Sequence, residues 1–380
     1  MQQPTHSSRF QEIDALRGVA ALLVVWMHVT ELFVKQEAIA QHGTWLYEVA
    51  RTVDFGRVGV VLFFAISGFV ICHSLRGEKK IASQRFLIRR TLRLYPAFWL
   101  SVVLSTWLFV SVLGRQIEAS TIVANLTMIP VVLGESQILG LYWTLETELV
   151  FYLLCWMLFM TGLLRRPEVL AALMWLMMLL FGVLMLDGIE ATEVPQWQSL
   201  PYHLSIMLWG GLLRYWFDHR GQDIRVGSFN LPLTGLLLIQ LLLIVSPLFF
   251  GLMMFMMSGD LTALMKAIPY VMAVGLFLVF GFWIPLRIRW MAWIGAISYS
   301  LYLFHPLIFL TVNQLLPQLP EQLSELHLGV YLLVCAILSI VLAASVYYLV
   351  EKPAIRLAGK WTRHTHTKKP QEQVPSSEVI

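Results

Sequence analysis

A cation and a histidine lie on one face of the first apolar stretch of the chain. Arg17 and His28 are eleven residues apart, which in a helix is a rise of about 16 Å and close to three turns. An ionisable side chain deep in an apolar helix is costly unless it faces a polar interior, and histidine is the side chain most often used as a general base. His28 is therefore either a functional base or a histidine that is hydrogen-bonded to a neighbouring helix.

Arginines gather at the start of the third apolar stretch. Arg90 and Arg93 are three residues apart and so share a helical face, where their guanidinium groups could grip phosphates. The alternative is that these arginines only mark the cytoplasmic side and contact anionic lipid. Because Arg17 lies on the same side of the membrane, the three side chains are candidates for an anion site below His28.

Two carboxylates meet the outer end of the fourth apolar stretch. Glu146 and Glu148 are two residues apart and cannot face the same way in a helix. Glu148 is the deeper of the two, and Tyr152 follows it on the same face. We expect Glu148 to lie at the depth of His28, where a carboxylate would orient the imidazole and stabilise its charged form. The alternatives are a structural ion pair and the proton relay of a transporter.

One face of the ninth apolar stretch carries Ser298, Tyr302 and His305. Pro306 follows them and is expected to break the helix near its middle. A broken helix at mid-membrane usually lines a cavity. The candidates for lining this cavity are Asp14, Tyr152, Ser298, Tyr302 and His305.

The second apolar stretch contains a pair of small residues, Ser67 and Gly68. Small residues let helix backbones approach closely in a membrane. We interpret this pair as a packing contact between helices, in preference to a ligand-binding role.

Composition identifies an integral membrane protein. The chain is 58% hydrophobic and 13% charged, with a mean hydropathy of +0.71, which is more apolar surface than a soluble fold of this length can bury. The sequence predicts an all-α bundle of about ten transmembrane helices. Their expected ranges are 12–33, 58–75, 92–112, 141–164, 169–187, 200–217, 231–256, 262–284, 293–316 and 328–350.

Basic residues are concentrated in every second loop and at the termini, while the alternate loops carry mostly acids. Short cytoplasmic loops are enriched in Lys and Arg, so both termini are expected to be cytoplasmic. The net charge of +4 reflects this topology, and no nucleic-acid partner is expected. One transmembrane domain is predicted over 1–356, followed by a polar, disordered cytoplasmic tail over 357–380. No cluster of His, Cys, Asp and Glu has the spacing of a metal site, so no metal is expected.

Taken together in chain order, these motifs resemble the acyltransferase-3 family of bacterial integral-membrane O-acyltransferases. No single motif is specific, but six of them occur in the order of the family over residues 11–357. They are Ile13 to Gly18 with His28, Phe63-Phe64 with Ser67 to Phe69, Arg90 and Arg93 before Tyr95-Pro96, Trp143 to Leu145 with Glu148, Ile297 to Tyr302 with His305-Pro306, and Glu351-Lys352-Pro353. The sequence departs from many relatives at Val61 and Leu149, where they carry acids, which leaves Glu148 to act alone or with Glu146.

The resemblance implies a function and a set of site residues. Members move an acyl group, commonly acetyl, from cytoplasmic acyl-coenzyme A to a hydroxyl of an extracytoplasmic or lipid-linked glycan, at the bacterial inner membrane. The expected donor-binding residues are Arg17, Arg90 and Arg93, and the expected catalytic residues are His28 and Glu148. Acyl-CoA is then a co-substrate, with no permanently bound cofactor, and the oligomeric state is left open.

Two rival functions fit parts of the pattern. In a transporter or flippase for an anionic or acylated substrate, the arginines would bind the substrate and His28 with Glu148 would relay protons. The chain shows no internal repeat of the kind that many transporters have, which argues against this function. A non-catalytic scaffold is the third alternative, and the intact set of charged residues argues against it.

Overall fold

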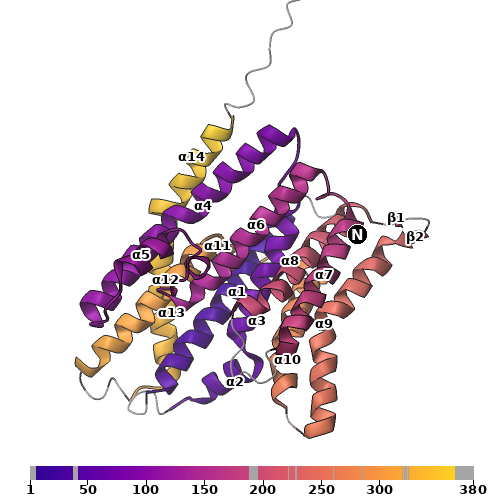
Figure 1. Cartoon of the computed structure of the whole chain (residues 1–380). Coiled ribbons are helices and arrows are strands. Elements are labelled where there is room, and N and C mark those ends of the chain that lie inside the picture. Colours follow the sequence, from indigo (N-terminus) through magenta and orange to yellow (C-terminus); the bar gives the residue numbers. More distant parts are fainter. Residues whose placement is uncertain are drawn as a thin grey trace, which may run out of the picture.

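The fold is a bundle of long helices, seen in a computed structural model of the chain (Figure 1). The structure describes residues 6–363, apart from 37–41, 188–195, 221, 227–228, 260, 285, 319, 321–322 and 324. Within this part, seven helices are long and apolar enough to cross a membrane, and two bent helix pairs meet the same criterion when each is counted as one span. The prediction of an all-helical multi-pass membrane protein is confirmed.

The long helices follow the predicted stretches closely. The first half of the chain forms α1 (His6–Val34), α2 (Trp45–Val53), α3 (Phe55–Ile71), α4 (Lys79–Trp107), the short α5 (Ala119–Leu126), α6 (Trp143–Thr161) and α7 (Pro167–Asp187). The second half forms α8 (Gln196–Asp218), α9 (Leu233–Ser258), α10 (Thr262–Leu278), α11 (Arg289–Ala296), α12 (Ser298–Leu315), α13 (Leu328–Val346) and α14 (Lys352–Arg363).

Two details near the ends of helices differ from the predictions. A short antiparallel hairpin, β1 (Asp223–Val226) and β2 (Phe229–Pro232), joins α8 to α9 at the end of the bundle where α14 also lies (Figure 1). Residues 357–363, assigned to the disordered tail, continue α14, an amphipathic helix that packs on α4. The rest of the predicted tail, 364–380, lies outside the described residues.

The helix that contains Pro306 does not break there, contrary to the prediction. Instead α12 runs continuously through Pro306, and the bend of 74° lies between α11 and α12, at Ile297. A proline removes one backbone hydrogen bond, and a helix can continue through it where another group satisfies the freed carbonyl. In α12 that group is the side chain of His305.

Ten spans are predicted and nine candidate spans are found in the described residues, and α8 is the predicted span that is not among the nine. It contains several buried polar side chains and is not among the spans that pass on length and hydropathy. It lies against α3, α6, α7 and α9, so that nearly every residue from 200 to 214 is buried in protein. A helix surrounded by other helices does not need a lipid-facing side, which explains its lower hydropathy.

Glycine contacts bring the helices around the site close together. A Cβ atom on Gly68 in α3 would lie 1.9 Å from the backbone oxygen of Met207 in α8. Similarly, a Cβ on Gly295 in α11 would lie 1.6 Å from the backbone oxygen of Asp14 in α1. Both distances are sterically forbidden to any other residue without movement of the backbone. The interpretation of Gly68 as a packing residue is confirmed.

Candidate active site

A cavity of about 290 Å³ lies between α1, α3, α4, α6 and α12. Its walls are largely apolar, with polar side chains gathered in two places. The polar and charged residues that line it are Asp14, Arg17, Ser67, Arg90, Arg93, Thr144, Glu148, Tyr152, Ser298, Tyr299 and Tyr302. Each of the five helices therefore contributes at least one group capable of binding a polar ligand.

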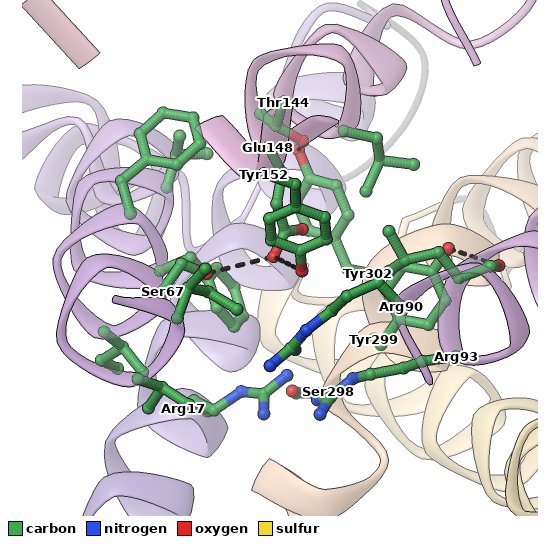
Figure 2. A pocket seen from close by; sticks show the side chains of 18 of the residues that line it. Arg17, Ser67, Arg90, Arg93, Thr144, Glu148, Tyr152, Ser298, Tyr299 and Tyr302 are labelled. Atoms are coloured by element: carbon green, nitrogen blue, oxygen red, sulfur yellow. Dashed lines mark hydrogen bonds between the residues drawn. The ribbon is translucent and has the colours of Figure 1, made fainter. Parts of the chain in front are cut away.

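Three arginines converge on one end of this cavity. Figure 2 shows the guanidinium groups of Arg17, Arg90 and Arg93 pointing toward one another, with Ser298 between two of them. Arg90 also stacks on the rings of Phe86 and Tyr152, at 5.6 Å and 5.3 Å from their centroids. Within the part of the chain that the structure describes, no carboxylate lies within 4.0 Å of any of the three guanidinium groups. These charges are thus free to bind an anion.

Glu148 is anchored inside the same cavity by two hydroxyl groups. The hydroxyl of Tyr152, one turn further along α6, donates to Oε1 of Glu148 at 2.5 Å, and Ser67 of α3 donates to the same oxygen at 3.2 Å (Figure 2). The two donors, one from α6 and one from α3, hold this carboxyl oxygen in place. Glu148 and Asp14 are the two acids of the lining, against three arginines, so the cavity favours an anionic ligand.

His28 has a different partner from the one predicted. Nδ1 of His28 lies 2.9 Å from Nε2 of His305, and the two rings are stacked nearly parallel with centroids 5.2 Å apart. No ion pair joins His28 to Glu148, although both are described residues. The expected orientation of the imidazole by Glu148 is therefore wrong. Equal depth in the membrane places two residues at one level, but it does not determine which side chain of the bundle each one faces.

Tyr302 connects the cavity with the histidine pair. Its hydroxyl accepts a hydrogen bond from Thr144 at 3.0 Å at the cavity wall, and its ring lies 6.1 Å from that of His305 between centroids. On the other side it contacts Phe63, which also lines the cavity. Phe63 and Tyr302 thus form a continuous series of ring contacts from the cavity wall to His305.

Comparison with known proteins gives the family. A family model described as an acyltransferase domain, that of acyltransferase-3, matches residues 10–348. The chain belongs to the acyltransferase-3 family. The matched range contains every residue of the cavity and both histidines.

Two curated relatives of the acyltransferase-3 chain match over shorter ranges. "Nodulation protein 10" of Rhizobium leguminosarum bv. viciae is 28% identical over 169 residues, which are 39% of this chain and 44% of that protein. "Protein 2 in picA locus" of Rhizobium radiobacter is 34% identical over 106 residues, 27% of this chain and 47% of that protein. The matches thus span less than half the length of either relative. No solved structure matches the chain significantly.

The structure brings together most of the site residues that the acyltransferase-3 motifs predict. Eight of the ten line the cavity, and the other two, His28 and His305, form the pair beyond it. Ser67 was interpreted with Gly68 as a packing contact, but its hydroxyl donates a hydrogen bond to Glu148 while Gly68 beside it serves packing. The analysis of the sequence missed Glu351, which is 2% exposed and accepts a hydrogen bond from Ser300 at 2.8 Å. Glu351 directly follows the last predicted span, and an acidic residue at that position could have been recognised as a candidate for a buried functional group.

Proposed function

We propose that this protein is a membrane O-acyltransferase that moves an acyl group, in the first place acetyl, from cytoplasmic acyl-CoA to a hydroxyl of an extracytoplasmic or lipid-linked glycan. The observation that carries the proposal is the convergence of Arg17, Arg90 and Arg93 on one cavity without carboxylate partners. Coenzyme A is a polyanion with a long, thin arm, and arginine binds phosphate through paired hydrogen bonds.

The proposed direction of transfer rests on charge asymmetry. The loop and helix start that precede Arg90 carry Arg76, Lys79, Lys80, Arg85 and Arg89, which supports a cytoplasmic position for this end. The arginine end of the cavity would then open toward the cytoplasmic pool of donor. His28 lies about 16 Å further along α1, toward the outer side. The acyl-bearing arm of the donor would reach it past Phe63 and Tyr302, in the bacterial cytoplasmic membrane.

The proposed chemistry needs one base near the thioester. The acceptor hydroxyl oxygen attacks the thioester carbonyl, its proton passes to His28, the new C–O bond forms and the C–S bond breaks. The proton then leaves His28 for the departing thiolate, so that free coenzyme A and the O-acylated product result. A positioned base of this kind contributes about 100- to 10,000-fold in rate.

The acceptor class is tested by comparing surface glycans from cells with and without the gene. We expect mass spectrometry to find a mass increase of one acyl group on a glycan only when the gene is present. Complementation with a His28→Ala variant that is inserted at the normal level should not restore the mass increase. Identical glycans in all strains would contradict a role in polysaccharide modification, and restoration by His28→Ala would contradict the proposed base.

A further inference from the structure

Pro306 leaves one backbone carbonyl of α12 without its usual partner. In an α-helix the N–H of residue i donates to the carbonyl of residue i−4, and proline has no N–H to give. The carbonyl affected by Pro306 is that of Tyr302. Nδ1 of the His305 ring lies 2.8 Å from this oxygen, and 3.2 Å from the carbonyl oxygen of Leu301. His305 thus satisfies the carbonyl that Pro306 frees, which is why α12 continues through the proline.

This contact determines where the proton of His305 sits. A carbonyl oxygen only accepts hydrogen bonds, so Nδ1 of His305 must carry the hydrogen. His305 is fully buried and no carboxylate contacts it among the described residues, so its ring is neutral and its Nε2 is a bare acceptor. The partner of that acceptor is Nδ1 of His28, at 2.9 Å. Nδ1 of His28 must therefore donate.

We propose that His305 is a positioning residue that holds His28 in the tautomer with hydrogen on Nδ1 and a free electron pair on Nε2. The inference deepens the proposed function, because Nε2 of His28 is then the atom that takes the proton of the acceptor hydroxyl. The chain of contacts runs from the carbonyl of Tyr302 through both rings of the pair. Glu31 and Asp54 act on His28 through space, and neither lies within ion-pair distance of it. Among the residues that the structure describes, the ring is therefore oriented by a neutral neighbour and by no carboxylate.

The tautomer can be measured without any assay of activity. The full-length protein is labelled with ¹⁵N in its histidine rings and reconstituted in lipid nanodiscs, and the His28 signals are assigned by their loss in His28→Gln. We expect a protonated Nδ1 and an unprotonated Nε2 for His28 in the wild type. In His305→Leu, where the acceptor is gone, the hydrogen should move to Nε2 in part or completely. A wild-type His28 with its hydrogen on Nε2 would overturn the inference, whether or not the protein transfers acyl groups.

Two further variants keep the test specific. His305→Gln offers a side-chain oxygen near the position of Nε2 and should preserve the Nδ1–H form of His28 better than His305→Leu does. His203→Leu removes another buried histidine, from α8, and should leave the His28 tautomer unchanged. If His203→Leu shifts the tautomer as much as His305→Leu, the effect is a general loss of packing and the inference fails.

Kinetics supply the second measurement. His305→Leu should lower kcat by about 10- to 100-fold, less than loss of the base itself, with the Kd for acyl-CoA unchanged because the arginines are intact. His305→Gln should recover part of this loss. Equal kcat in His305→Leu and the wild type would overturn the inference. A wild type that transfers no acyl group would instead contradict the proposed function, and the nitrogen signals would still decide the tautomer.

Discussion

Tyr152 donates its hydroxyl hydrogen to Glu148 at 2.5 Å, one helical turn back along α6. The same tyrosine ring lies under Arg90, whose guanidinium carbon is 5.3 Å from the ring centroid. One side chain thereby fixes a carboxylate on one side and a cation on the other. The position of the Arg90 guanidinium in the cavity consequently depends on α6 as well as on α4.

Removal of the Tyr152 hydroxyl should destabilise the protein. A hydrogen bond to a charged group is worth about 1.5–3 kcal/mol. In Tyr152→Phe, Ser67 is the one hydrogen-bond donor to Glu148 that remains among the described residues. Thermal unfolding in detergent micelles measures the change. Tyr270→Phe is the control, because the hydroxyl of Tyr270 makes no hydrogen bond with the described residues, and it should unfold near the wild-type temperature. Equal stability of the Tyr152 and Tyr270 variants would mean that the hydrogen bond from Tyr152 to Glu148 does not stabilise the protein.

Glu148→Gln should affect donor binding more than the chemical step. Glu148 lines the arginine cavity and acts through space on Arg17 and Arg93, while His28 has another partner. We expect KM for acyl-CoA to change and kcat to fall by less than about 10-fold, whereas His28→Ala should lower kcat by about 100- to 10,000-fold. Steady-state kinetics of the two variants check this. A loss of kcat in Glu148→Gln equal to that in His28→Ala would indicate that the two residues act together in catalysis, as the sequence predicts.

Removal of two of the three arginine charges should weaken acyl-CoA binding. Arg90→Gln and Arg93→Gln each remove a charge-assisted contact worth about 1.5–3 kcal/mol. The double variant should bind with a strongly raised Kd in isothermal titration calorimetry, and its remaining affinity should depend less on salt. Arg220→Gln is the matched control, since Arg220 stacks on Trp216 and Phe217 outside the cavity. Unchanged binding in the double variant would reduce these arginines to markers of membrane topology.

The orientation of the bundle can be tested with single cysteines. In a variant without the three native cysteines, Cys at Thr44 should react with an impermeant maleimide added to intact spheroplasts, and Cys at Gln222 should react only after lysis. Both positions are exposed, and they lie in loops of opposite charge character. The reverse labelling pattern would invert the proposed positions of donor and acceptor.

Gly68 should tolerate no side chain. The Cβ of Gly68→Ala would lie 1.9 Å from the Met207 backbone oxygen, so α3 and α8 must separate. Overpacking typically costs about 1–3 kcal/mol or more, and we expect a large loss of folded protein in fluorescence-detected size exclusion. Gly182→Ala in α7 is the control, because nothing lies within 4 Å of its Cβ position. Normal yield of Gly68→Ala would show that this helix contact is loose.

Some of the site was predictable from the sequence because helical periodicity and charge are local properties. Arg90 and Arg93 share a face at a spacing of three, and the cavity contains both. The partner of His28 was not predictable in the same way. It depends on the rotation of α1 against α12 and on a carbonyl freed by Pro306, and both are set by packing between segments 277 residues apart. The sequence predicts a helix break at Pro306 because proline removes a backbone hydrogen bond in an isolated helix. This rule does not take into account a side chain that donates a hydrogen bond to the freed carbonyl.

The burial of α8 has a consequence for how the protein enters the membrane. Its buried polar residues Gln198, His203, Ser205 and Arg214 would be costly to expose to lipid on an isolated helix. α8 must therefore insert in the company of α3, α6 and α7, which precede it in the chain and against which it packs. A chain from which α7 is deleted should accordingly be recognised by membrane quality control and degraded, because a large part of the surface that covers α8 is then missing.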